Sequence, residues 1–337
     1  MKKMCLCLAV LIGFIQICNT AEIVKADTVP TEELYVFDTD ETSYAAHYSE
    51  YQALEWGNTV TVGMQEITAC EQPDVKFCAV DGKQGMNIGD DNSWVEMTIK
   101  IPSSGRYALN IHYYNTPGPA RSIECSILVD GKRPYKELSN LTLPRIWRDH
   151  ADENGVTIQQ DSQGNDRLPD AEEINRWNTL WLWDAQGMYE EPYCLYLSEG
   201  VHVLRLSSAH DNFIFGGLEL GASPRAENYA EYSAKHADKP NTVKTGKVYQ
   251  AENYKEKNSS QIYSASDRTD AATVPNDPVC KRINVIGGAN WKYTGQEISW
   301  KIDVPETGLS DHPHTGGRSD FIRLRRLESR RTRRMAL

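Results

Sequence analysis

Short segments in which hydrophobic and polar residues alternate constrain the fold of this chain more than any other feature. The first two flank the turn Pro102-Ser-Ser-Gly105, and the third ends at the hairpin pair Asp130-Gly131. Alternation with a period of two places successive side chains on opposite faces of a strand. Several such strands with regular turns are typical of an antiparallel β-sandwich. The sequence therefore predicts an all-β protein. The alternating segments are 94–101, 106–113, 122–129, 193–197, 201–206 and 214–220.

An internal repeat divides the chain. Residues 298–308 match residues 95–105 position by position in residue type, because each is an alternating segment that ends in Pro-x-x-Gly. A repeat of this kind indicates two copies of one structural unit. We predict a first module over residues 42–223 and a second copy over 248–309, joined by a polar linker at 224–247.

The second copy is predicted to be truncated. The first copy continues for about a hundred residues beyond its Pro-x-x-Gly turn, whereas only residues 309–337 follow the corresponding turn of the second. Residues 310–337 hold eight Arg and no Lys and sum to +5, against -16 for all residues before them. We interpret residues 310–337 as a basic tail produced by a frameshift near Leu309. The alternative is a natural basic tail that binds an anionic surface.

The N-terminus has the pattern of a signal peptide over residues 1–26, followed by a linker at 27–41. Lys2 and Lys3 precede an apolar run that is too short for a typical membrane span, and Ala26 offers a cleavage site. We therefore expect a protein that is secreted or displayed on the cell surface. The net charge of -11 argues against nucleic acid and anionic membranes as partners.

Several pieces of the sequence occur in the order typical of one protein family. Residues 249–254 are similar to its opening strand, and 94–115 to its Trp-bearing strand, Pro-x-x-Gly turn and Tyr-rich strand. Residues 198–206 are similar to its Gly-x-His-x-Leu strand, and 213–220 to its last strand. In this order the pieces resemble carbohydrate-binding modules of families six and thirty-five. The resemblance implies a galactose-binding-like jelly-roll β-sandwich with a second, truncated copy, and an oligo- or polysaccharide as ligand.

The tandem arrangement also resembles the front of bacterial extracellular solute-binding proteins of sugar importers, which implies membrane sugar-transporter components as further partners. The family often carries a structural calcium, and its ligands include the Glu of the opening strand, which Glu252 matches in the second copy. In the first copy the counterpart at 51–55 has one extra residue, and Gly216-Gly217 stands where a ligating Asp is expected. Residues 161–166 could fold around calcium or form a solvated loop.

Residues 145–191 break the alternation, because they are polar, rich in Asp and Trp, and too long for a simple hairpin loop. Sugars bind to aromatic faces and to side chains that hydrogen-bond their hydroxyl groups. The predicted sugar contacts in and beside this insertion are Tyr114, Asn115, Trp147, Asp149, Trp177 and Asp184. The alternatives are that Trp181 and Trp183 pack the insertion internally and that Asn115 serves only a turn.

Catalysis is not expected. The insertion offers many carboxylates, but no pair stands out as the acid and base of a glycosidase. The sequence contains no Gly-x-Ser-x-Gly motif and no evident Ser-His-Asp order. We therefore predict a secreted, non-catalytic carbohydrate-binding protein, the N-terminal fragment of the solute-binding protein of a sugar importer. The alternatives are an accessory module of a polysaccharide-degrading glycoside hydrolase and a structural cell-surface spacer.

Overall fold

The computed structural model describes most of the two predicted modules. The predicted leader, the linker at 27–41 and nearly all of the basic tail lie outside the described residues, so the predictions for them remain predictions. The described residues belong to one compact unit. They are 43–71, 75–89, 92–151, 156–225, 227–238, 249–270, 273–287, 290–293 and 295–302, together with the backbone of 333–336.

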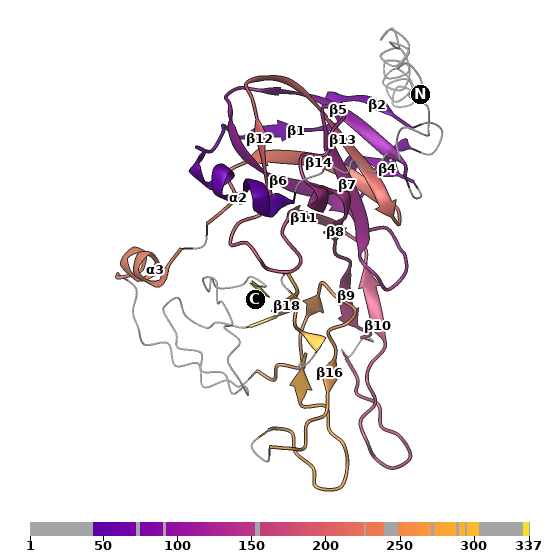
Figure 1. The fold of residues 1–337 in the computed structure, drawn as a ribbon. Coiled ribbons are helices and arrows are strands. Elements are labelled where there is room, and N and C mark those ends of the chain that lie inside the picture. The colour runs from indigo at the N-terminus through magenta and orange to yellow at the C-terminus, as the bar shows by residue number, and fades with distance from the viewer. Residues whose placement is uncertain are drawn as a thin grey trace. The chain divides into compact units, whose positions relative to one another are not determined.

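Two antiparallel sheets form the first module (Figure 1). Sheet A has the strand order β11-β6-β14-β4-β3, with β1 beside β14 and β12 beside β6. Its strands are β1 (Val60–Val62), β3 (Lys76–Val80), β4 (Lys83–Ile88), β6 (Gly105–Tyr114), β11 (Trp177–Trp181), β12 (Cys194–Leu197) and β14 (Phe213–Gly221). Sheet B has the order β2-β5-β13-β7-β8. Its strands are β2 (Ile67–Cys70), β5 (Trp94–Ile101), β7 (Ile123–Val129), β8 (Leu141–Leu143) and β13 (Gly200–His210).

Successive strands cross between the two sheets, which is the jelly-roll connection. The chain passes from β4 in sheet A to β5 in sheet B, then to β6 in A and β7 in B, and again from β12 through β13 to β14. The Asp130-Gly131 pair has φ values of 51° and 75°, the positive angles that a tight hairpin turn needs. The prediction of an all-β jelly-roll sandwich is confirmed.

The core lies between the two sheets because the predicted alternation holds. In β7 every second residue is buried, from Ile123 to Val129, and β5 buries Val95, Met97 and Ile99. They share a hydrophobic core with Phe215 and other inward residues of sheet A. Each large apolar side chain that is removed from water in this way contributes about 1.5–3 kcal/mol.

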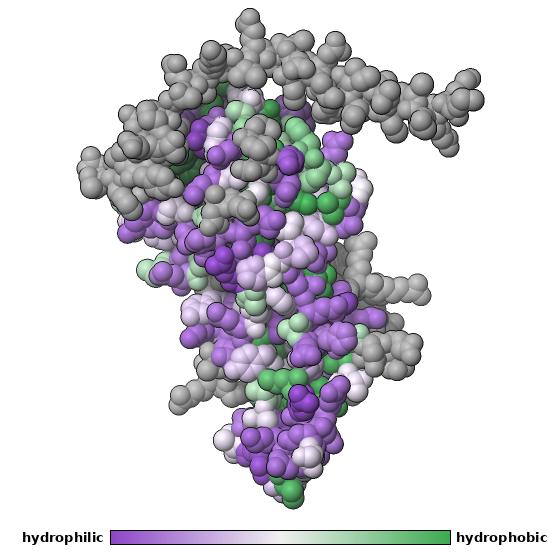
Figure 2. Space-filling model, turned by 90° about the vertical axis from the view of Figure 1, so that its right-hand side faces the viewer, coloured by the Kyte–Doolittle hydropathy of each residue, from purple (hydrophilic) through white to green (hydrophobic). Residues whose placement is uncertain are grey.

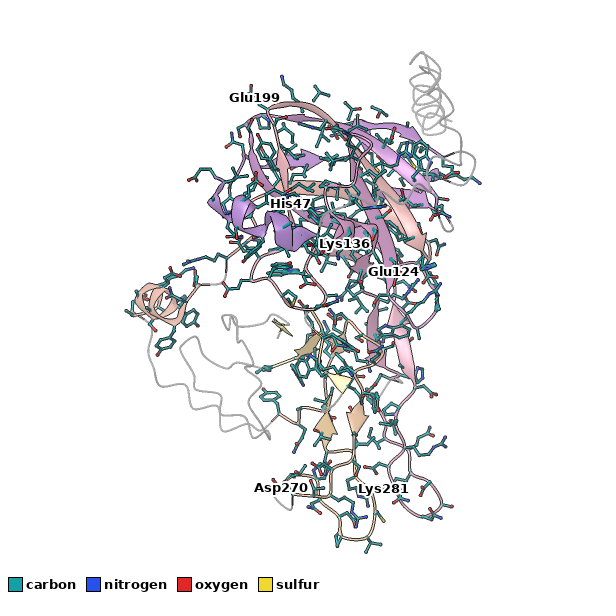
Figure 3. All side chains as sticks on the ribbon, viewed as in Figure 1. His47, Glu124, Lys136, Glu199, Asp270 and Lys281 are labelled. Atoms are coloured by element: carbon teal, nitrogen blue, oxygen red, sulfur yellow. The ribbon has the colours of Figure 1, made fainter. Side chains whose placement is uncertain are left out.

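Beside β12, the helix α2 (Tyr44–Ala53) contributes to a cluster of tyrosines. The ring centroid of Tyr44 lies 4.8 Å from that of Tyr135 and 4.9 Å from that of Tyr193. Its backbone N–H donates to Glu137 in the short helix η3 (Lys136–Ser139), and Figure 3 labels His47 and Lys136 on these two elements. The first-copy opening strand expected at 51–55 is wrong, because Tyr51 lies in the last turn of α2.

The second segment, 249–302, repeats the strand pairing with which the first module begins. Strand β15 (Glu256–Lys257) pairs with β18 (Glu297–Trp300) as β2 pairs with β5, and β16 (Ser264–Ala265) pairs with β17 (Val285–Ile286) as β3 pairs with β4. A small core holds the segment together. It consists of Tyr254, Ile262, Ile298 and Trp300. In place of the opening strand expected at 249–254, strand structure begins at Glu256.

The insertion divides between the two modules. Strands β9 (Ile146–Asp149) and β10 (Ala171–Ile174) pair with each other, and β9 also pairs with β15 of the second segment. A third sheet, β10-β9-β15-β18-β19, therefore runs from the insertion into the second segment and ends at β19 (Arg333–Ala336). The insertion then returns to sheet A as β11, which pairs with β6. Strand β9 thus covers one edge of β15, an edge that a half-built sandwich would expose.

The remaining elements are η2 (Met64–Glu66) and the helix α3 (Tyr229–Lys235), which Asn228 caps by accepting from the N–H of Glu231. Among the described residues, no helix is both long and apolar enough to cross a membrane. Polar residues cover most of the described surface in Figure 2, and hydrophobic ones gather only in small patches.

Candidate functional site

Asn115 is fully buried and holds the insertion to the end of β6. Its side-chain N–H groups donate to Glu173 Oε1 at 2.9 Å and to the carbonyl of Ile174 at 3.0 Å. Its Oδ1 accepts from the backbone N–H of Arg176 at 3.2 Å and from Asn178 Nδ2 at 2.9 Å. The amide has no exposed surface, so in this structure it joins strands and presents nothing to a ligand.

Three other predicted contacts are also engaged within the protein. Trp147 is 8% exposed on β9. Asp149 is half-buried and accepts from the hydroxyl of Tyr254, and burial raises its pKa. Asp184 is buried and accepts from the N–H groups of Gln186 and Met188, so it shapes the loop after β11.

Tyr114 and Trp177 do come together. They are register partners on β6 and β11, their ring centroids lie 5.7 Å apart, and both are half-buried. Trp177 reaches across sheet A, because its Nε1 donates to the carbonyl of Val80 at 3.0 Å. Glycine is required beneath the indole, since a Cβ at Gly216 would lie 2.4 Å from Trp177 and one at Gly85 would lie 2.9 Å from it.

Strand β11 lines one face of sheet A with indoles. Trp177 and Trp181 share the face of β11 that lies beside Tyr114 and Asn110 of β6, and Trp181 is half-buried and also packs against the edge of the hydrophobic core. The strand ends at Trp181 and is about 13 Å long at roughly 3.3 Å per residue. One more ladder bond follows, from the N–H of Leu182 to the carbonyl of Leu109 at 3.0 Å, and Trp183 lies just beyond the strand.

Trp183 is the residue on this face that sequence reasoning undervalued. It is 39% exposed, and of the eight tryptophans, all of which are described, it alone belongs to the exposed class. Internal packing was the alternative that the sequence left open for both Trp181 and Trp183. Trp181 does pack against the edge of the core, whereas Trp183 lies beyond the end of β11 and stays exposed.

Polar groups lie beside these indoles on the same outer face. Asn110 is 6% exposed, and its Oδ1 has no hydrogen-bond partner among the described residues. His112 Nδ1 lies 3.0 Å from the hydroxyl of Thr179, and burial lowers the pKa of His112, so the ring is neutral at pH 7. Glu219 of β14 is the register partner of Asn110. We call the outward residues 110, 112, 114, 177, 179, 181, 183 and 219 the β11 face. Its indoles, neutral ring and hydrogen-bonding groups can hold an uncharged polyol.

A Ser-His-Asp arrangement occurs on the opposite sheet, but its hydrogen bonds do not suit catalysis. His202 Nδ1 lies 2.7 Å from Asp130 Oδ2, and its Nε2 lies 2.9 Å from the carbonyl of Ser198 and 3.3 Å from Ser198 Oγ. Both oxygens at the shorter distances can only accept, so both ring nitrogens are placed to donate, which favours the imidazolium form of His202. Burial alone would lower the pKa of His202, but these hydrogen bonds raise it. An imidazolium cannot take a proton from Ser198, so the group is a structural clip.

The residues considered for calcium do not form a cluster. Both carboxylate oxygens of Asp161 accept from N–H groups of its own loop, including Gln163 N at 2.8 Å and Asn165 Nδ2 at 3.0 Å. Glu252 is half-buried, and burial raises its pKa. Within the described ranges, no group of three or more His, Cys, Asp or Glu side chains could hold a metal ion.

No protein-family model matches the chain, and no curated protein matches it. Among solved structures, the chain is similar to a family 35 carbohydrate-binding module from Clostridium thermocellum, with 16% identity over 48% of this chain and 97% of that chain, at a TM-score of 0.31. It is also similar to the C-terminal family 6 module of a marine laminarinase from Zobellia galactanivorans, with 16% identity over 49% of this chain and 100% of that one (TM-score 0.29). A family 35 module from Cellvibrio japonicus matches with 14% identity over 51% and 99% of the two chains (TM-score 0.28).

Proposed function

We propose that this chain is a non-catalytic carbohydrate-binding protein and that a glycan binds along the β11 face. The observation that carries the proposal is a row of three indoles along an edge of sheet A: Trp177 and Trp181 share one face of β11, and the exposed indole of Trp183 follows just beyond the strand end. An extended saccharide has apolar C–H surfaces along its length, so a row of indoles matches it better than a single ring would.

The expected affinity is modest. Covering about 50 Å² of one indole stabilises a complex by roughly 1.2 kcal/mol at 25 cal/mol per Å², so three indoles favour binding by a few kcal/mol before the cost of association. The polar groups of the β11 face set the orientation. The unpartnered oxygen of Asn110 is buried and would accept from a bound water beneath the ligand, and His112 offers a neutral ring nitrogen.

The setting of this function is proposed from the sequence. A signal peptide at residues 1–26 would export the chain, and the tandem modules would serve as the front of the extracellular solute-binding protein of a sugar importer. Membrane sugar-transporter components are then its partners. An accessory module of a polysaccharide-degrading enzyme would use the same β11 face but would require a catalytic domain elsewhere in its polypeptide.

A polysaccharide array with a matched pair of variants tests the proposal. The wild-type chain should bind at least one polysaccharide, and Trp183→Ala should weaken that binding about five-fold or more without loss of stability, because the indole is exposed. Tyr229→Ala is the control, since Tyr229 is 85% exposed on α3, away from this face. A wild-type chain that binds no glycan, or a Trp183→Ala variant that binds as well as wild type, would refute the proposal.

A further inference from the structure

A small cavity with a mixed polar and apolar lining lies where β11 meets the second segment. Its volume is about 50 Å³. Both modules contribute to its lining, the first through residues of β6, β9 and β11 and the second through β15 and β18. The polar residues of the lining include Arg176, Asn178, Thr179, Glu256, Lys257 and Ser299.

Most of these polar side chains are deeply buried. Asn178 is 7% exposed, Glu256 6%, and Lys257 and Ser299 3% each. Burying polar groups at this depth costs free energy unless each of them finds a partner. The lining combines these polar side chains with apolar ones such as Ile146 and Leu180, whereas a dry packing defect is lined by apolar groups alone.

The charges around the cavity are already balanced. Arg176 forms a bidentate pair with Glu256, at 2.8 and 3.0 Å. Lys257 donates to the carbonyl of Ile262, and Asp149 offsets part of the desolvation that lowers the pKa of Lys257. The lining holds two cations, Arg176 and Lys257, and two carboxylates, Glu256 and Glu297. Because these formal charges cancel, the cavity favours a neutral group with hydroxyls over an ion.

The cavity borders the β11 face. Thr179 lines it and also shares the hydrogen bond with His112 on the outer side of sheet A. Asn178, the preceding residue, points into the same region from the core side of β11. A saccharide that lies along Trp177, Trp181 and Trp183 would therefore pass the mouth of the cavity at the edge strand.

The size of the cavity limits what can enter. One water needs about 10–15 Å³ by the same measure, so the cavity holds about three to five waters. A hydroxymethyl group or a short hydroxyl-bearing substituent fits this space, whereas a pyranose ring does not.

We infer that this cavity is a subsite that receives a neutral, hydroxyl-bearing group projecting from the bound glycan, and that the second segment completes the sugar site in this way. The inference rests on the proposed function of the β11 face. On this inference the truncated second copy lines part of the sugar site of the first module and does not bind a second glycan of its own.

Hydrogen exchange on the full chain tests the inference. The probe is the hexasaccharide prepared from the polysaccharide that the array identifies. Binding should slow amide exchange at residues 177–183 and also at 256–258 and 297–299. Protection confined to 177–183 would overturn the subsite and leave the proposed function standing. If no glycan binds at all, the proposed function itself fails.

A pair of identical substitutions gives a second test. Ser299→Thr adds a methyl group at the cavity lining and should lower affinity for the hexasaccharide about five-fold. Ser264→Thr is the matched control, because Ser264 is also 3% exposed and lies in β16, outside the cavity. Equal affinities of the two variants would overturn the subsite. If Ser299→Thr does not fold, the exchange measurement on the wild-type chain still decides.

Discussion

The substitution Asn115→Ala separates a structural role of this amide from a direct role in sugar binding. In the structure Asn115 makes four side-chain hydrogen bonds inside the protein, to Glu173, Ile174, Arg176 and Asn178. If it acts as a strand junction, its removal should destabilise the fold. If it contacted sugar, its removal should weaken binding and leave stability nearly unchanged.

The expected loss of stability in Asn115→Ala depends on which other hydrogen bonds the former partners of Asn115 retain. Four hydrogen bonds at about 0.5–1.5 kcal/mol each would sum to about 2–6 kcal/mol. Two partners retain other contacts, because Glu173 still accepts from Arg145 Nη1 at 2.9 Å and Asn178 still donates to the carbonyl of Arg176 at 2.9 Å. We therefore expect a loss of about 3 kcal/mol, which lowers Tm by about 6–12 °C for a domain of this size.

Urea unfolding followed by tryptophan fluorescence measures this loss. Asn140→Ala is the matched control, since Asn140 is exposed and should change stability by less than about 0.5 kcal/mol. Asn115→Asp should destabilise the fold more than Asn115→Ala near neutral pH, because it places a second carboxylate beside that of Glu173. The difference in stability between the two variants should shrink as the pH falls and the carboxylates become protonated. A loss below about 1 kcal/mol in Asn115→Ala, accompanied by lost sugar binding, would refute the junction.

Two further predictions concern the clip on sheet B and the glycine under the indole. The pKa of His202 is raised by Asp130 and the Ser198 carbonyl, so the clip is fully stabilising below about pH 6.5 and is lost as the pH rises through the folded-state pKa. His202→Gln should therefore be less stable than wild type by about 0.5–1 kcal/mol at pH 5.5 and nearly equal to it at pH 9, as thermal unfolding would measure; an equal difference at both values would contradict the imidazolium. Gly216→Ala should lose about 1–3 kcal/mol in urea unfolding because its Cβ would overlap Trp177, and an unchanged urea midpoint would contradict the close contact.

The β-sandwich could be predicted because the patterns that indicate it lie within single strands and turns of the sequence. The alternation from Trp94 to Ile101 survives intact in β5, and the Gly216-Gly217 interruption of the last strand coincides with a shift of register between Phe215 and Gly217. These features depend on the residues themselves and their immediate neighbours. The helix α2 escaped prediction because Tyr44 is buried among tyrosines from distant parts of the chain.

The candidate site was less accessible to sequence reasoning because burial there is decided by distant partners. Asp149 is engaged by Tyr254, which lies 105 residues away, and Trp147 pairs across to Lys257 of the second segment. Nothing near either residue in the sequence signals these contacts. By contrast, Trp177 and Tyr114 were predicted as separate contacts and meet on one face, since both lie on strands whose alternation can be read directly.

The division of the insertion links the truncated copy to the site. Strand β9 covers an edge of β15, the ion pair between Arg176 and Glu256 ties the second segment to the start of β11, and Trp177 follows Arg176 in the chain. Any movement of the second segment would therefore act on the first residue of the indole row. Arg176→Gln should leave Glu256 buried without its cation, which commonly costs about 3–5 kcal/mol, and should weaken glycan binding although residue 176 lies off the β11 face. The same loss of stability with unchanged affinity would show that the two modules are joined mechanically but act independently.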